Sequence, residues 1–520
     1  MRMLMALLLA ASTFAADPVS LAPAKMPRLA TVDERFQSFN VEMVEVTGGR
    51  FWAPYRDEGK PAETPAKAGL AVPAIDPALF RTREPLDLSN PRLRKLAAGL
   101  GPSYVRVSGT WANSTYFHDS DGPAPKTPPE GFGGILTRAQ WKGVVGFSQA
   151  VNAKIITSFT ISAGTRDAKG VWTPAEATKL LGYTKSIGGN IAAAEFFNEP
   201  SFAGMGGAPK GYDAAAYGRD VAIWLRFVKN AASGMLVLGP GSVGEGGPMA
   251  AGLPGALKSE DLLKAAGAGV DVFSYHFYGG VSRRCGNMGS AIQTTPEAAL
   301  SEEWLGRTDR DAAFYIALRD RFEPGKPMWL TETGETACGG NPWASTFTDT
   351  FRYLDQLGRL ARKGVKVVAH NTLAASDYGL IDEVSMTPRP SYWAAVLWSR
   401  LMGKTVLDAG AAPAGVHLYA HCLPGHEGGV SVLAINLDQT AAHMVTIPTA
   451  AERFTLSSST GLRSSIVELN GTPLKLNGDE EKLPRWKGIQ TAAGAVKLEP
   501  ASITFLAMPG TGSTTCEIED

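Results

Sequence analysis

Between residues 40 and 371, short apolar runs of strand length alternate with stretches of helical pattern. The run at residues 192–198 is made mostly of small and aromatic apolar residues, which is typical of a parallel strand covered on both faces. Eight such runs occur, at residues 40–46, 103–108, 153–159, 192–198, 235–239, 270–276, 327–331 and 365–371. Eight strand-then-helix units predict a (β/α)8 TIM barrel, in the α/β class, and a doubly wound sheet is the alternative.

Two of the expected helices have recognisable starts. Thr137 is followed by Gln140 and Thr173 by Glu176, so each pair matches a capping box, in which two side chains satisfy exposed backbone groups. The second start also places Pro174 at the first helical position, where its missing N–H does no harm. The remaining expected helices span residues 212–233, 305–321, 344–363 and 390–401.

The pattern changes after Gly403, where long helical stretches give way to short β-type runs separated by turn residues. These runs are residues 416–422, 429–437, 444–448, 454–458, 466–470 and 495–508. They predict a C-terminal all-β sandwich domain. We therefore expect a catalytic barrel over residues 39–403 and a β-sandwich built from residues 17–38 and 404–520. Two loops rich in proline, at residues 55–81 and 119–134, are expected to rise from the catalytic face.

Residues 1–16 have a basic residue at position 2, continue with an apolar run and end in small residues, which is the pattern of a secretory signal peptide. The apolar run is too short to cross a bilayer as a helix, and no later run is long enough. Lys plus Arg (50) equals Asp plus Glu (50), so charge gives no reason to expect a nucleic-acid or membrane partner. We expect a secreted or periplasmic protein.

Export makes disulfide bonds possible. The four cysteines, Cys285, Cys338, Cys422 and Cys516, allow three pairings, and four free thiols are the alternative. We favour Cys285 with Cys338 and Cys422 with Cys516, because each pair then lies within one expected domain.

Two glutamates lie at the ends of predicted barrel strands. Glu199 follows the fourth strand in an Asn-Glu-Pro turn, and Glu332 ends the seventh. Catalytic residues of such barrels come from the carboxyl ends of the strands, so the two side chains are expected to face each other. A retaining glycosidase needs two carboxyls about 5–5.5 Å apart, one protonated to serve as acid and one ionised to attack the sugar.

Three motifs give these positions a family context: residues 196–202 (FFNEPSF), 274–278 (SYHFY) and 329–333 (WLTET). Together with residues 392–403, they resemble glycoside hydrolase family 79 of clan A, which holds β-glucuronidases and heparanases. The resemblance implies that Glu199 is the general acid/base and Glu332 the nucleophile. It also implies a retaining enzyme that cleaves β-D-glucuronide linkages in saccharides and needs no cofactor.

The resemblance suggests further substrate-binding residues. Asn198 would contact the sugar 2-hydroxyl, Tyr278 would orient Glu332, and His276 would support the site. The remaining candidates are Gly339 and Gly340 as a backbone nest for the uronate carboxylate, Tyr378 for the same carboxylate, and Glu45 and Asn113 for sugar hydroxyls.

Glu335 is a competing nucleophile, because it lies in a Gly-Glu-Thr sequence similar to that of animal heparanases. We favour Glu332, since a strand fixes its position. The glycine-rich stretch 239–244 spells a dinucleotide fingerprint but lacks an opening βαβ unit, so a tight loop is expected there. Neither a His-Glu-x-x-His motif nor a Gly-x-Ser-x-Gly elbow occurs in the sequence, which argues against a catalytic metal and a serine esterase.

Two alternatives stay open. An endo-acting, heparanase-like enzyme on heparan sulfate should line its cleft with basic residues, for which Arg283, Arg284, Lys126 and Lys142 are candidates. A barrel that binds carbohydrate without catalysis is the second alternative, and the presence of both carboxyls counts against it.

Overall fold

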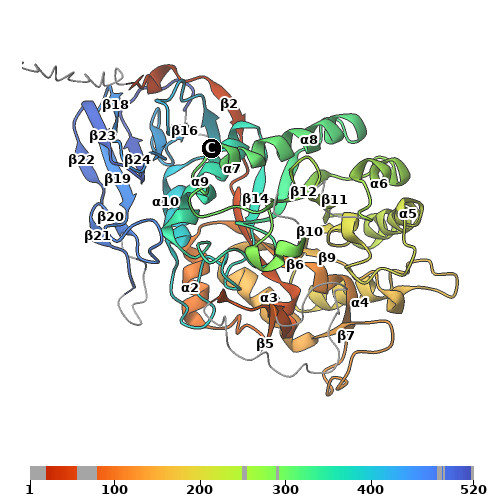
Figure 1. The fold of residues 1–520 in the computed structure, drawn as a ribbon. Coiled ribbons are helices and arrows are strands. Elements are labelled where there is room, and N and C mark those ends of the chain that lie inside the picture. Colours follow the sequence, from red (N-terminus) through yellow and green to blue (C-terminus); the bar gives the residue numbers. More distant parts are fainter. Residues whose placement is uncertain are drawn as a thin grey trace, which may run out of the picture.

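A computed structural model describes residues 19–55, 79–248, 255–288, 292–476, 483 and 486–516. Its centre is a closed barrel of eight parallel strands in the order β10-β11-β12-β13-β14-β3-β6-β9 (Figure 1). These strands are β3 (Gln37–Glu42), β6 (Ser103–Ser108), β9 (Ala153–Ser158), β10 (Ile191–Glu195), β11 (Leu236–Val243), β12 (Val272–Tyr278), β13 (Met328–Gly334) and β14 (Val367–His370). The predicted TIM barrel is confirmed, and its eight strands are those expected from the apolar runs.

A helix follows each barrel strand and packs on the outside of the barrel. These helices are α2 (Pro91–Gly99), α3 (Arg138–Ala150), α4 (Ala175–Ser186), α5 (Ala214–Ala231), α6 (Ser259–Ala266), α7 (Glu302–Leu305) with α8 (Arg307–Phe322), α9 (Phe347–Arg362) and α10 (Pro390–Leu401). The chain therefore reaches the same end of the barrel after every strand, and the loops at the carboxyl ends of the strands gather at one face.

The two predicted capping boxes have different outcomes. Thr137 caps α3 as expected, because its hydroxyl accepts from the Gln140 N–H at 3.2 Å while the Gln140 side chain accepts from the Thr137 N–H at 2.8 Å. The box at Thr173 is wrong. Pro174 is the N-cap of α4, and the Thr173 hydroxyl donates to the Thr165 carbonyl instead. Glu176 accepts from Lys179 and from the Phe117 N–H.

Two strand predictions also need correction. Residues 43–46 form the short helix α1 (Met43–Thr47), because Glu42 and Glu45 make a capping box that ends β3 and begins the helix. The run at 495–508 is two strands, β23 (Gly494–Leu498) and β24 (Ser502–Met508), which belong to different sheets. A turn through Ala501, which has a positive φ of 45°, separates them.

Two β-sheets pack beside the barrel. The smaller sheet holds β1 (Val19–Ser20), β18 (His443–Ile447) and β23. The larger holds β2 (Arg28–Thr31), β15 (Thr405–Leu407), β16 (Val416–Cys422), β17 (Val430–Asn436), β24, β19 (Ala451–Ser457), β20 (Glu468–Leu469), β21 (Thr472–Pro473) and β22 (Ile489–Thr491). Val445 and Val496 of the smaller sheet share one buried apolar cluster with Val432 and Leu506 of the larger, as in a sandwich.

Segments distant in sequence are joined at the edges of these sheets. β1 pairs with β18 and β2 pairs with β15, so the described N-terminal segment adds a strand to each sheet. The Cys285–Cys338 and Cys422–Cys516 disulfides are both present, which confirms the favoured pairing. Residues 1–16, where a signal peptide is expected, and most of the loop at 55–81 lie outside the described residues. Within the described ranges, no helix combines the length and apolar character needed to cross a membrane.

Candidate active site

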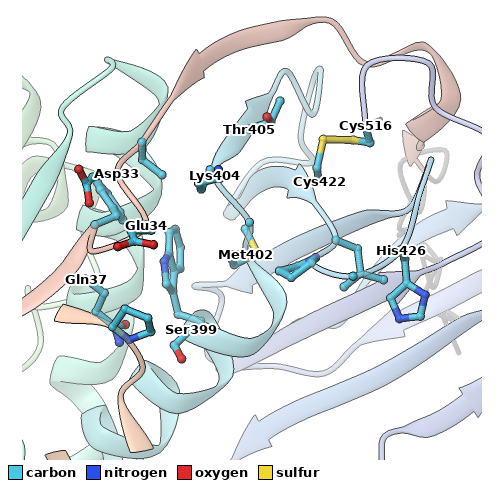
Figure 2. Close-up of a pocket in the computed structure, with 18 of the residues that line it drawn as sticks. Asp33, Glu34, Gln37, Ser399, Met402, Lys404, Thr405, Cys422, His426 and Cys516 are labelled. Atoms are coloured by element: carbon cyan, nitrogen blue, oxygen red, sulfur yellow. A yellow bond between two sulfur atoms is a disulfide. The ribbon is translucent and has the colours of Figure 1, made fainter. Parts of the chain in front are cut away.

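Two cavities compete for the role of active site. The first, of about 350 Å³, lies between the barrel and the β-sheets and is lined by Phe36, Leu100, Trp398 and the Cys422–Cys516 disulfide (Figure 2). Phe36 and Leu100 precede β3 and β6, so this cavity opens at the amino ends of barrel strands. Catalytic residues of (β/α)8 enzymes lie at the opposite, carboxyl ends, which argues against the first cavity.

The second cavity, of about 130 Å³, lies where the barrel strands end and holds both predicted catalytic glutamates. Its polar lining consists of Glu42, Thr110, Glu199, Tyr278, Glu332, Asn371 and Tyr378. Its apolar lining includes Trp52 and Trp111.

Glu199 and Glu332 lie close together in this cavity. One carboxylate oxygen of each and Nδ1 of His276 are all within 4.8 Å of one another. Carboxyls about 5–5.5 Å apart are typical of retaining glycosidases, whereas inverting enzymes leave about 6.5–9.5 Å for a water molecule. The geometry therefore matches a direct attack by one carboxylate on the sugar.

The backbone at Glu199 is strained into position. Glu199 adopts φ 50° and ψ 65°, a left-handed conformation that non-glycine residues rarely take. Such a conformation costs about 1–3 kcal/mol and persists where surrounding contacts impose it. Asn113 makes two of those contacts, because its Oδ1 accepts from the Asn198 N–H and its Nδ2 donates to the Asn198 carbonyl, both at 2.8 Å. Both amide atoms of Asn113 thus bond the Asn198 backbone, and Asn113 is not among the residues that line the cavity.

The surroundings of Glu199 favour its protonated form. Burial raises the pKa of Glu199, the hydrogen bond with His276 lowers it, and the negative charge of Glu332 raises it again, so the pKa ends above its usual value. A carboxyl that keeps its proton at higher pH is suited to general acid catalysis.

Glu332 accepts two hydrogen bonds from opposite sides. Arg106 Nη1 donates to Oε2 and the Tyr278 hydroxyl donates to Oε1, both at 2.8 Å. Asn371 then donates to the Tyr278 hydroxyl at 3.0 Å and to the Tyr378 hydroxyl at 3.3 Å. The predicted contact between Tyr278 and Glu332 is present. Both donors need Glu332 as an acceptor, which suits a carboxylate nucleophile.

Arg106 is one residue of the site that the sequence interpretation missed. It projects from β6 and is almost completely buried, with 1 % exposure. Besides Glu332, its guanidinium contacts Glu195 Oε2 and Asn198 Oδ1, each at 2.8 Å. The sequence does indicate that Arg106 is buried, because it lies between two valines of an apolar run, and a buried charge must be paired.

Glu195 is the second partner of Arg106. In a regular strand, the side chains of Glu195 and Asn198 would point to opposite faces, yet both contact Arg106. Strand alternation does not determine side-chain direction beyond Glu195, because β10 ends at Glu195 and the chain bends over the next residues. Ser274 and Thr331 also donate to Glu195. Burial raises the pKa of Glu195, but Arg106 and His276 outweigh burial and hold it well below its usual value.

His276 lies beneath the two catalytic candidates and does not line the cavity. Its Nδ1 is 3.2 Å from Glu199 and 3.8 Å from Glu332, and its Nε2 is 3.6 Å from Glu195. Burial lowers the pKa of His276, but Glu332 and the hydrogen bonds with Glu195 and Glu199 raise it overall to about 9. His276 therefore supports both carboxyls from below, as the sequence interpretation expected.

Glu45 is not in the cavity, so its predicted sugar contact is wrong. It is fully buried and accepts from the Glu42 N–H at 2.7 Å. Glu42, which the sequence interpretation passed over, is the residue of this segment that lines the cavity. Its Oε2 has no hydrogen-bond partner among the described residues, and Gly109 leaves room for it, since a Cβ there would lie 1.5 Å away. Burial raises the pKa of Glu42, and the charge of Glu332 adds to the rise.

Gly339 and Gly340 follow Cys338 in a run of three residues with positive φ. Cys338 lines the cavity, and the two glycines lie behind it. A Cβ on Gly339 would come within 2.7 Å of Trp52, and one on Gly340 within 3.2 Å of Tyr378. The glycines therefore allow this loop to pack closely against two residues of the cavity wall.

Glu335 is outside the cavity and binds its own loop. It accepts from the Asn341 backbone N–H at 2.8 Å, from the Asn341 side chain at 3.2 Å and from the Thr336 hydroxyl at 2.8 Å. Asn341 in turn accepts from the Arg283 N–H. These bonds connect the loops after β12 and β13 and favour Glu332 as the nucleophile candidate.

Glu199, His276 and Glu332 are also spaced closely enough to hold a metal ion. The guanidinium of Arg106 is 3.2 Å from His276 Nε2 and 2.8 Å from Glu332. A second cation would therefore be repelled, and the donor set does not fit a divalent ion well.

A (β/α)8 barrel whose strand ends bring two glutamates together defines a glycoside hydrolase. The family model described as "Glycosyl hydrolase family 79, N-terminal domain" matches residues 84–358. The chain therefore belongs to glycoside hydrolase family 79.

Relatives of known name cover most of the chain. Heparanase-like protein 1 of Arabidopsis thaliana is 28 % identical over 443 residues, which cover 81 % of this chain and 75 % of the relative. Heparanase of Mus musculus is 27 % identical over 482 residues, covering 80 % and 84 %. Among solved structures, an α-L-arabinofuranosidase of Thermotoga maritima shares the fold with a TM-score of 0.61 and 14 % identity, covering 94 % of this chain and 99 % of that one.

Proposed function

We propose that this chain is a retaining β-glucuronidase, with Glu199 as general acid/base and Glu332 as nucleophile. The observation that carries the proposal is the separation of no more than 4.8 Å between oxygens of the two carboxyls. The raised pKa of Glu199 suits the proton donor, and the two hydrogen bonds that Glu332 accepts suit an ionised nucleophile.

The reaction runs in two displacements. In the first, Glu199 gives its proton to the glycosidic oxygen while a Glu332 oxygen bonds to the anomeric carbon and the bond to the leaving group breaks. In the second, Glu199 takes a proton from water, the water oxygen bonds to the anomeric carbon, and the bond to Glu332 breaks. Both glutamates return to their starting state, and the sugar is released as the β-anomer.

The buried end of the cavity supports binding of one sugar ring. Arg106 occupies Asn198 Oδ1, which leaves Asn198 Nδ2 as a donor for the sugar 2-hydroxyl. Glu42 lines the cavity and brings a carboxyl group for another hydroxyl. Tyr378, which lines the cavity, is the group we assign to the uronate carboxylate, and Gly339 and Gly340 shape the loop behind it. The volume of about 130 Å³ is small beside the roughly 300–1,000 Å³ of sites for drug-sized ligands, which favours a single terminal sugar.

The endo-acting alternative has weaker support. Of the four basic candidates for sulfate binding, none lines this cavity, and Arg283 lines a separate cavity of about 930 Å³ instead. Arg284 is directed to the Ala53 carbonyl and Asp377, while Lys126 and Lys142 are exposed elsewhere. Export stays part of the proposal and is supported by the N-terminal pattern and by two disulfides, which persist in oxidising compartments.

A panel of 4-nitrophenyl glycosides tests the proposal. We expect hydrolysis of the β-D-glucuronide at a rate at least a hundredfold above that of the β-D-glucoside and the α-L-arabinofuranoside. Proton NMR should show the β-anomer of glucuronate as the first product. Preference for an uncharged glycon would reject the substrate assignment, and initial release of the α-anomer would reject the retaining mechanism. Absence of hydrolysis across the panel would favour the non-catalytic barrel.

A further inference from the structure

The active-site cavity has a buried polar end and an exposed apolar mouth. Glu42, Tyr278, Glu332 and Tyr378 at the polar end are all buried. Four apolar residues of the lining are partly exposed: Trp52, Trp111, Phe202 and Met205. Met205 is 37 % exposed, which is unusual for a large apolar side chain in this protein. An exposed apolar group beside a catalytic centre suggests a ligand contact.

Glu199 marks the boundary between these two parts. Its side chain is 17 % exposed, against 7 % for Glu332, so the acid lies nearer the mouth than the nucleophile. The acid must reach the glycosidic oxygen, and therefore the leaving group lies on the exposed side of the cavity.

Phe202 and Met205 lie on that side because they follow Glu199 in the same loop. The Phe202 N–H donates to the Glu199 carbonyl at 2.8 Å, and the Met205 N–H donates to the Phe202 carbonyl at 2.9 Å. Two successive turns thus fix both apolar side chains relative to the acid.

The charge of the cavity agrees with an uncharged leaving group. Within the described lining, the ionisable acids are Glu42, Glu199 and Glu332, and no lysine or arginine is present. A sulfated leaving group would find no cation here, whereas an aromatic ring could contact both the Phe202 ring and the Met205 thioether.

We propose that Phe202 and Met205 form an aglycone site that selects uncharged, aromatic leaving groups. This inference rests on the proposed β-glucuronidase function and adds the class of aglycone to it. An enzyme with such a site differs in its preferred leaving group from an enzyme whose leaving group is a sulfated sugar.

The test uses three alkyl β-D-glucuronides, the methyl, 2-phenylethyl and 2-sulfoethyl compounds, all with poor alcohol leaving groups, so that differences report mainly on binding. We expect kcat/KM for the 2-phenylethyl compound to exceed that for the methyl compound at least tenfold, and the 2-sulfoethyl compound to be the poorest. Met205→Ser should reduce the ratio of 2-phenylethyl to methyl at least threefold. Met205→Lys should raise kcat/KM for the 2-sulfoethyl compound relative to the methyl compound.

The matched control is Met444→Ser, which changes a methionine of almost equal exposure (36 %) in the C-terminal β-sheets. It should keep the wild-type ratio. A wild-type ratio near one, a preference for the 2-sulfoethyl compound, or a ratio unaffected by Met205→Ser would overturn the aglycone proposal while leaving the β-glucuronidase assignment intact. Failure to hydrolyse any glucuronide would overturn both.

Discussion

Arg106 Nη1 lies 2.8 Å from Glu332 Oε2 and connects β6 to β13 across the inside of the barrel. The same guanidinium contacts Glu195 and Asn198, so one buried cation organises three residues around the site. Replacing it removes the partner of two buried carboxylates, which costs about 3–5 kcal/mol in comparable cases.

We therefore expect Arg106→Met to lower the free energy of unfolding by about 3–5 kcal/mol and kcat by at least a hundredfold. Denaturant unfolding and steady-state kinetics measure the two effects. Arg166→Met is the matched control, because Arg166 makes a comparably buried ion pair with Asp220 (2.7 Å) outside the cavity. The control should lose stability but keep kcat at temperatures where it is folded. Equal loss of kcat in both variants would contradict a specific role for Arg106.

The pH dependence of kcat/KM should report on Glu199. Because its pKa is raised and its protonated form gives the proton to the leaving group, kcat/KM should fall as pH rises through that pKa. Glu199→Gln should remove this alkaline limb when assayed on 2,4-dinitrophenyl β-D-glucuronide, whose leaving group needs no proton. Persistence of the limb in Glu199→Gln would assign the titration to another group.

Two buried glutamates outside the cavity should make the fold less stable at neutral pH. Burial raises the pKa of both Glu335 and Glu45 to about 7, so between about pH 4.5 and pH 7 the folded state binds protons that the unfolded state has lost. Stability must therefore fall as pH rises through this window. Glu335→Gln should reduce the fall by about 3 kcal/mol, measured as unfolding free energy at pH 4.5 and pH 7.5. An unchanged pH dependence would show that Glu335 ionises normally in the folded protein.

The Cys285–Cys338 disulfide should control substrate affinity, because Cys338 lines the cavity and the next two glycines pack against Trp52 and Tyr378. We expect the Cys285→Ser, Cys338→Ser double variant to raise KM about tenfold with a smaller change in kcat. Removal of the Cys422–Cys516 disulfide is the control. The sequence separations are 53 and 94 residues, so each bond should contribute about 4 kcal/mol by loop entropy, and the two variants should lose similar stability. A similar rise of KM in both would contradict a local effect.

The barrel could be predicted from the sequence because its strands are apolar runs at regular intervals, and α10 was expected with the bounds it has. Hydrogen bonds between side chains and the nearby backbone made β3 end at a different residue from the one that the apolar pattern predicts. Glu42 and Glu45 end β3 at Glu42, before the predicted end at residue 46, by capping α1, which moved the cavity-lining carboxyl from the predicted Glu45 to Glu42. Periodicity does not report such side-chain bonds to the backbone.

The sequence predicts those site residues whose position depends only on the end of a single barrel strand. Glu199, Glu332, Tyr278 and Tyr378 meet in one cavity as expected, because parallel strands deliver their ends to one face. Arg106 lay beyond this reasoning, since its role depends on partners from β10 and β13 that only closure of the barrel brings together. The bonds between Asn113 and the Asn198 backbone likewise join two strand ends that only the closed barrel brings together.

The central claim is that Glu332 attacks the sugar and Glu199 transfers the proton. Its most direct test is the product formed by Glu332→Gly with an aryl β-D-glucuronide and sodium azide. In that variant, azide enters the space of the missing carboxylate, and NMR should identify the α-glucuronyl azide. Formation of the β-azide by Glu332→Gly, or hydrolysis at the wild-type rate without azide, would contradict the assignment of Glu332 as the nucleophile.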